Sequence, residues 1–138
     1  MRQEEVVLRV PSSPAYVSVV RHAVACLARK MAFSAHDVSD IQLAVGEACN
    51  NAVKHGLEEG KHPVRIRCKI ASTDLCVEVT NRYDGDPPCQ AIGCKPEPCE
   101  YNEGGMGVFL MNTLVDSVKF RWGKRTATVS LTKNVRTS

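Results

Sequence analysis

The chain has 138 residues, of which 43% are hydrophobic and 24% are charged, and a formal net charge of +3. This length fits one domain with a sizeable core. A net charge of +3 is too small to argue for a nucleic-acid partner on its own, and the absence of a long apolar run predicts no membrane span. The opening residues, "MRQEEVVLRV", lack the pattern of a secretory signal, so we expect a cytoplasmic protein whose seven cysteines are reduced.

The first predicted elements are a strand and a helix. The segment "EEVVLRV" (4–10) is typical of a strand, and "PSSP" then ends it and begins a helix. Ser13 is the candidate N-cap of that helix, and Pro14 stands at its first position, where a missing N–H is tolerated. We expect this helix to reach about Met31.

A second helix is predicted over residues 35–56. Ser34 and Asp37 have the S-x-x-D spacing of a capping box, and Gly56 ends the apolar pattern. At 100° per residue, one face of this helix is entirely apolar or small. We expect that face to be buried, and it comprises Val38, Ile41, Val45, Ala48, Cys49 and Ala52.

The second half of the chain is predicted to hold two hairpins around a helix. The expected elements are strands 64–70 and 75–81 joined by "ASTD", an irregular segment from 82 to about 105, a helix from about 108 to 116, and the strands "VKFRW" and "RTATVSLTK" joined by the turn "GK". Strands grouped in hairpins between helices predict the α+β class, here a two-layer α/β sandwich with a mixed, largely antiparallel sheet. We expect residues 1–138 to form one domain.

The polar side of the second helix holds residues that a helix normally avoids. Gly46 costs about 1 kcal/mol relative to Ala in a helix interior, and Asn50 and Asn51 cost less but stand together. Glu47 lies one turn before Asn51, so the two side chains project together. For an isolated Glu a solvated face is the usual explanation. The pair, however, could provide a general base and one oxygen ligand for Mg²⁺, which otherwise binds water and phosphate oxygens.

A glycine turn stands where the irregular segment enters the third helix. Gly104, Gly105 and Gly107 permit close backbone approach, and the free N–H groups at a helix N-terminus favour phosphate. On its own this pattern is a weak signal, because many helices begin after a glycine turn. Together with the Glu47 and Asn51 pair, it favours a nucleotide-binding site.

These motifs resemble those of the histidine-kinase-like, Bergerat-fold ATPases. Glu47-x-x-x-Asn51 followed by His55 and Gly56 resembles their N-box, "GGMGVFLM" resembles their second glycine box, and residues 82–106 take the place of the mobile ATP lid. Within that superfamily, residues 5–133 are most similar to the small anti-sigma factor serine kinases of the RsbW and SpoIIAB type.

The resemblance implies a kinase that uses ATP and Mg²⁺ to phosphorylate a serine on an anti-sigma-factor antagonist, a STAS-type protein. It also implies that the kinase sequesters a sigma factor or another client in a partner switch, and that it forms a homodimer. Neither direct nucleic-acid binding nor membrane binding is expected. The alternative is a binding module of the same fold that has lost ATP turnover and acts by sequestration only.

The resemblance also implies residue roles. Glu47 would be the general base, Asn51 the magnesium ligand, and the N–H groups from Gly105 to Val108 the phosphate cradle. The full set of expected nucleotide-binding residues is Asn50, Asn51, Lys54, His55, Asn81, Asp84, Gly85, Gly104, Gly105, Met106, Gly107 and Val108.

Two positions leave alternatives open. The family's first glycine box begins with an Asp that receives the adenine amino group, but here Asn81 stands at that position and Tyr83 stands where its Gly is expected. Either Asn81 accepts through its amide oxygen, or the loop is shifted and Asp84 serves. Arg21, on the flank of the first helix, is expected to contact protein partners, the alternative being a side chain that covers apolar surface.

Overall fold

The computed structural model describes residues 3–56, 61–83 and 105–136, with the backbone alone for 105–107. The elements in chain order are β1 (Glu4–Val10), a short 3-10 turn (Pro14–Tyr16), α1 (Val17–Arg29), α2 (Ala35–His55), β2 (Val64–Ile70), β3 (Asp74–Arg82), α3 (Gly105–Leu114), β4 (Ser117–Gly123) and β5 (Thr126–Asn134).

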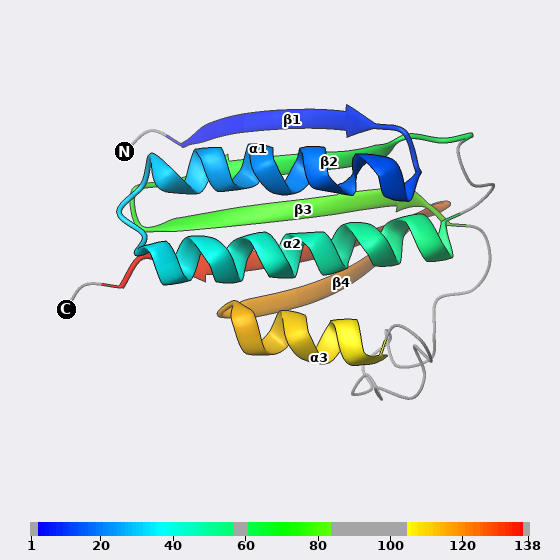
Figure 1. Ribbon diagram of the computed structural model, residues 1–138. Coiled ribbons are helices and arrows are strands. Elements are labelled where there is room, and N and C mark those ends of the chain that lie inside the picture. Colours follow the sequence, from blue (N-terminus) through cyan, green and yellow to red (C-terminus); the bar gives the residue numbers. More distant parts are fainter. Residues whose placement is uncertain (1–2, 57–60, 84–104, 137–138) are drawn as a thin grey trace.

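The described strands form one sheet in the order β1-β2-β3-β5-β4, and all four pairings are antiparallel. The three helices lie side by side on one face of this sheet (Figure 1). The α+β class and the two-layer arrangement are therefore confirmed, and the sheet is antiparallel throughout the part of the chain that the structure describes. No helix of that part is long and apolar enough to cross a bilayer.

The first helix begins later than its sequence pattern predicts. Ser13 accepts a hydrogen bond from the Ala15 backbone N–H at 3.3 Å, but this cap opens a 3-10 turn rather than an α-helix. The α-helix itself starts at Val17 and ends at Arg29, two residues before Met31. The 3-10 turn is common at helix N-termini, where the first N–H groups have no intrahelical partner.

The second helix forms as predicted, apart from its last residue. The Ser34 hydroxyl accepts a hydrogen bond from the Asp37 backbone N–H at 3.1 Å, as expected for the capping box. The helix ends at His55, because Gly56 is already in an extended conformation. The whole predicted apolar face is buried, with Val38, Ile41, Val45, Ala48, Cys49 and Ala52 at most 6% exposed.

The third helix is displaced toward the glycine turn. It starts at Gly105 instead of about Val108 and ends at Leu114, because the Asp116 backbone N–H already donates to the Thr132 carbonyl of the closing hairpin at 2.9 Å. The expected ATP lid, residues 82–106, lies mostly outside the described residues. At its ends, Arg82 belongs to β3 and Gly105 to α3.

The turn of the last hairpin is also shifted by one residue. Gly123 pairs with Thr126, so Lys124 and Arg125 form the loop instead of the expected Gly123 and Lys124. Arg125 has a φ of 62°, the left-handed conformation that tight hairpin turns require and that non-glycine residues adopt at some cost.

The core fills the space between the helix layer and the sheet. Its largest fully buried side chains come from all layers and include Val20, Ile41, Ile66, Leu75 and Met111. Two cysteines belong to this core: burial raises the pKa of the Cys49 thiol to about 12 and that of Cys68 to about 11. Both are therefore small apolar core residues at neutral pH.

A buried lysine joins the end of α3 to the start of α2. Lys133 on β5 is 4% exposed, and its ammonium donates to the Leu114 carbonyl, the last residue of α3, at 2.8 Å. It also forms ion pairs with Asp37 at 3.7 Å and Asp40 at 3.9 Å in the first turns of α2. The two helices are thus held together at the end opposite the glycine turn.

Candidate functional site

The predicted residues of α2 lie in its C-terminal half, on the side away from the sheet. Glu47 and Asn51 are half-buried, whereas Asn50, Lys54 and His55 are exposed. In Figure 1, α2 and α3 run in opposite directions, so this half of α2 lies beside the start of α3. The structure therefore brings the two predicted motifs to the same end of the helix layer.

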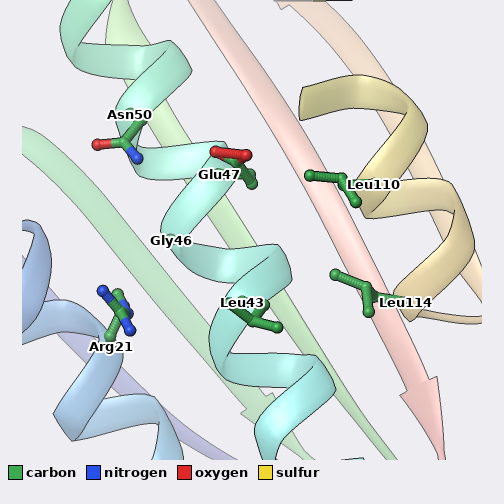
Figure 2. A pocket seen from close by; sticks show the side chains of 7 residues that line it. All are labelled: Arg21, Leu43, Gly46, Glu47, Asn50, Leu110 and Leu114. Atoms are coloured by element: carbon green, nitrogen blue, oxygen red, sulfur yellow. The ribbon is translucent and has the colours of Figure 1, made fainter. Parts of the chain in front are cut away.

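A groove of about 280 Å³ lies over this part of α2, between α1 and α3. Figure 2 shows Arg21 on one side, Leu110 and Leu114 on the other, and α2 as the floor. The seven lining residues are Arg21, Leu43, Gly46, Glu47, Asn50, Leu110 and Leu114. A cation, a carboxylate and an amide thus face the same opening as three leucines, a mixture suited to a protein segment as well as to a polar group.

Gly46, which is costly in a helix interior, has a packing role in the structure. A Cβ at this position would lie 2.9 Å from Cδ of Arg21, closer than such atoms approach one another. The missing side chain therefore makes room for the Arg21 side chain, and Gly46 need not be explained by a bound nucleotide. Within the described part of the chain, the buried Nε of Arg21 has no hydrogen-bond partner.

Asn51 holds a second buried donor without a partner. Its Nδ2 is inaccessible to solvent and makes no hydrogen bond within the described residues. A buried amide donor of this kind needs an acceptor, which a phosphate oxygen or an ordered water would provide. No group of three or more His, Cys, Asp or Glu residues in the described ranges could hold a metal ion. The site therefore fits Mg²⁺ only as an ion bound mainly by phosphate and water, with one amide oxygen from the protein.

Asn81 lies where the end of β3 meets the end of α2. It is 9% exposed, and its Nδ2 donates to the Arg82 carbonyl at 2.9 Å, which leaves the amide oxygen as an acceptor. A Cβ on Gly56 would lie 2.6 Å from the Ala52 carbonyl oxygen and 3.4 Å from Asn81 Nδ2, so glycine permits this close contact. Asp84 lies outside the described residues, so the choice between it and Asn81 stays open.

The glycine box forms the first turn of α3. Gly105, Met106, Gly107 and Val108 are its first four residues, and the N–H groups of a helix's first turn have no intrahelical acceptor. The Val108 side chain is 6% exposed and anchors this turn in the core. Gly85 and Gly104 lie outside the described residues.

Sequence reasoning missed the leucines of the groove. Leu110 and Leu114 are one turn apart on α3, and Leu43 lies one turn before Glu47 on α2. Apolar residues at this spacing normally indicate core, although Leu43 is 51% exposed. A leucine one turn from a candidate catalytic carboxylate was the signal that could have placed Leu43 at the site.

The fold and these motifs agree with the comparisons with known proteins. Residues 10–133 match the family described as "Histidine kinase-like ATPase domain", and the chain belongs to that family.

Curated relatives give a narrower group. The serine-protein kinase RsbW of Bacillus velezensis is 35% identical over 91% of this chain and 82% of its own length, and the protein of the same name from Bacillus subtilis is 34% identical with the same coverage.

Solved structures agree on the fold. The RsbU and RsbW domains from Mycobacterium tuberculosis superpose with a TM-score of 0.70 at 18% identity, over 98% of this chain and 34% of theirs. A chain of the SiaB–SiaC complex from Pseudomonas aeruginosa superposes with a TM-score of 0.67 at 14% identity, over 94% of this chain and 88% of its own.

Proposed function

We propose that this chain is a protein serine kinase that uses ATP and Mg²⁺ to phosphorylate a serine on an anti-sigma-factor antagonist of the STAS type. In the same partner switch it sequesters a sigma factor or a similar client. The relatives named serine-protein kinase RsbW support the class of reaction. The observation that carries the proposal is the position of Glu47, whose carboxylate lines the groove between the three helices, one turn before the buried Asn51 amide.

In this proposal each polar group has one task. Glu47 accepts the proton of the serine hydroxyl while the serine oxygen bonds to the γ-phosphorus and ADP leaves. Asn51 is the protein ligand of Mg²⁺, which when bound neutralises charge on the phosphates. The N–H groups from Gly105 to Val108 hold phosphate oxygens at the start of α3. Asn81 or Asp84 accepts from the adenine amino group.

The remaining predicted residues surround these groups. Asn50, Lys54 and His55 continue the polar side of α2 past Glu47, and Gly85 and Gly104 belong to residues 82–106, the segment that we propose as the ATP lid.

The groove itself is the proposed contact for the protein partner. Arg21 lines it together with Leu43, and Phe109 on α3 is 62% exposed. Arginine is among the residue types enriched where an interface contributes most to protein–protein affinity. Arg21→Ala should therefore weaken binding of the antagonist or the client, which calorimetric titration of each partner would measure. Unchanged affinity for both would remove Arg21 from this role.

The proposal also includes a single domain, a homodimer and a cytoplasmic location. Light scattering of the purified chain would test the dimer directly, because a dimer would have twice the 15.1 kDa mass of the chain.

Phosphoryl transfer to a candidate antagonist tests the central claim. With labelled ATP and Mg²⁺, Glu47→Gln should lower the transfer rate by at least about a hundredfold, since it removes the base while keeping the shape of the side chain. ATP affinity should change little. The matched control is Glu5→Gln, a change of the same type on the other face of the sheet. Transfer that survives in the Glu47 variant would show that another group is the base.

A sequestration module without turnover is the second candidate, and Asn81 favours it. A neutral amide acceptor contributes about 1 kcal/mol where a carboxylate contributes about 1.5–3 kcal/mol, so adenine would bind more weakly. A thermal-shift titration separates the two, because a ligand that binds only the folded state raises the melting temperature by mass action. No shift with ATP and Mg²⁺, together with intact partner binding, would favour the module.

A further inference from the structure

The face of the sheet opposite the helices carries a distinct set of side chains. In Figure 1 all three helices cover one face, and no described helix or strand covers the other, which we call the open face. Because side chains alternate along a strand, the neighbours of the inward-facing Val64, Ile66 and Val118 belong to the open face. These neighbours include Arg65 and Lys119, both exposed.

The strand register arranges most of the open face in three rows that run across the whole sheet from β1 to β4. Two shorter rows flank them: Arg82, Thr126 and Gly123 beside the first, and Asp74 and Asn134 beside the third. The first row is Arg9, Arg65, Thr80, Thr128 and Arg121; the second is Val7, Arg67, Glu78, Ser130 and Lys119; the third is Glu5, Lys69, Cys76, Thr132 and Ser117. Basic residues occur in all three rows, whereas acidic residues occur only in the second and third.

The two acidic residues of the three full rows, Glu5 and Glu78, are already paired. The Arg67 guanidinium donates to the Glu5 carboxylate, with an Nε–Oε2 distance of 2.8 Å, and holds the pKa of that carboxyl below its usual range. Lys69 donates to Glu78 at 3.2 Å, and Arg67 lies 3.8 Å from the same carboxylate. The second and third rows thus balance most of their own charge.

The first row is different, because none of its three arginines is in direct contact with a carboxylate. Arg9 stands directly opposite Arg65, a like-charged cross-strand pair that destabilises a sheet. Arg121 lies three strand spacings from Arg65, about 14 Å. None of the three makes a hydrogen bond or ion pair within the described ranges, and the Thr80 and Thr128 hydroxyls between them bond to each other at 2.9 Å. A bound anion would remove the repulsion.

We propose that the open face binds the phosphate backbone of a nucleic-acid duplex through Arg9, Arg65 and Arg121. Arginines spread over a flat polar surface suit a regular array of phosphates and carry no sequence information. The open face presents no exposed aromatic side chain within the described residues, so it lacks the stacking platforms of single-strand binders. The net charge of +3 does not reveal the positive charge of this surface, because it is a sum over the whole chain.

Other occupants fit the open face less well. Val7, 45% exposed, is its one large exposed apolar residue among those described, whereas protein interfaces are built around an apolar centre. A second copy of the chain packed about a two-fold axis through the first row would place the same arginines opposite one another.

Fluorescence anisotropy with a short labelled DNA duplex of mixed sequence tests the proposal. Binding should be weak, with a dissociation constant of about 10⁻⁴–10⁻⁶ M, and three neutralised phosphates should give a slope of about −2.7 for log K against log salt. Arg65→Gln with Arg121→Gln should weaken binding more than about tenfold at low salt and bring the slope to about −0.9. The matched control is Arg29→Gln with Lys30→Gln, which removes the same charge from the exposed end of α1 and should leave both values unchanged.

Circular dichroism establishes that each variant is folded before it is compared. An RNA duplex should bind as DNA does, and ATP with Mg²⁺ should leave binding unchanged, since the groove lies on the other side of the sheet. An equal loss of duplex affinity in the Arg65/Arg121 variant and in the Arg29/Lys30 control would overturn the proposal. So would tighter binding to polyglutamate or to phosphatidylserine vesicles than to the duplex, or a change of oligomeric mass in the Arg65/Arg121 variant.

Discussion

Gly46 and Arg21 form a contact between two helices that depends on the absence of one side chain. Glycine in the middle of α2 lowers helix stability by about 1 kcal/mol relative to alanine, but it lets Arg21 pack against α2 and line the groove. The arginine is thereby placed beside Glu47 and Asn50, with its Nε buried. The proposed catalytic and partner-binding groups thus share one groove, at the expense of some helix stability.

A double-mutant cycle measures this contact. In an Arg21→Ala background, Gly46→Ala should stabilise the protein by up to about 1 kcal/mol, because the new Cβ meets no arginine. In the parent protein, the stabilisation by Gly46→Ala should be smaller by at least about 0.5 kcal/mol, since Arg21 must move to admit the new Cβ. Urea unfolding of the four proteins gives the coupling. In the control cycle, which pairs Gly46→Ala with Arg29→Ala, the two changes in unfolding free energy should add. If they also add in the Arg21 cycle, the contact between Arg21 and Gly46 has no energetic effect.

Cysteine reactivity should follow burial. Cys26 is exposed on α1, whereas Cys49 is 3% exposed and its pKa is raised to about 12, so almost none of it is thiolate at neutral pH. Iodoacetamide followed by peptide mass mapping should modify Cys26 at least about tenfold faster than Cys49. In denaturant the two rates should converge. Equal rates in the folded protein would mean that α2 opens readily.

At the scale of elements, Lys133 connects α2, α3 and β5 in the core. It caps the last carbonyl of α3 and pairs with two carboxylates in the first turns of α2. The cation lies at a helix C-terminus and the carboxylates at a helix N-terminus, so both helix dipoles favour the arrangement. It fixes the end of the helix pair that is remote from the candidate site.

Lys133→Met should destabilise the protein by about 3–5 kcal/mol, because the nearly isosteric methionine leaves Asp37 and Asp40 without their cation. Urea unfolding measures the loss. Lys119→Met on the exposed side of β4 is the control and should change stability by less than about 0.5 kcal/mol. Combining Lys133→Met with Asp37→Asn and Asp40→Asn should recover part of the loss, and a triple variant no more stable than the single one would contradict the charge explanation.

Local patterns in the sequence predicted most elements and part of the site. The bounds of β1 and β2, the Ser34 cap and the buried face of α2 depend on residues close in sequence, and all were predicted. The proximity of Glu47 to Asn51 follows from helix geometry alone. The Arg21–Gly46 contact, the leucines of the groove and the Lys133 ion pairs could not be predicted, because they depend on how separate elements pack. The start of α3 was misplaced because glycines were taken to precede the helix, whereas they form its first turn.

For the whole molecule, the pKa values of the buried thiols predict a loss of stability at alkaline pH. A thiol ionises near pH 9 when unfolded, but at about 11 for Cys68 and about 12 for Cys49 when folded. The folded state therefore keeps protons that the unfolded state releases. The stabilisation is complete below about pH 9 and is lost as the pH rises toward 11 and 12.

Between about pH 8 and pH 10 the two thiols together should remove about 3 kcal/mol of unfolding free energy. Urea unfolding at the two pH values measures this change. In the variant Cys49→Ala with Cys68→Val, the free energy of unfolding should fall by correspondingly less over the same pH interval, and any remaining fall would be due to other groups. An identical loss in the variant would show that the thiols do not set the alkaline limit.

The sheet order has a consequence for how the protein is made. The last strand to be synthesised, β5, occupies an interior position between β3 and β4. Until β5 has been synthesised and has left the ribosome, β3 lacks one neighbour and β4 has no strand to pair with, so the nascent chain exposes two unsatisfied edges. The sheet can therefore be completed only after β5 has emerged, and a message truncated before the codon for Thr126 would yield a chain unable to close its own sheet.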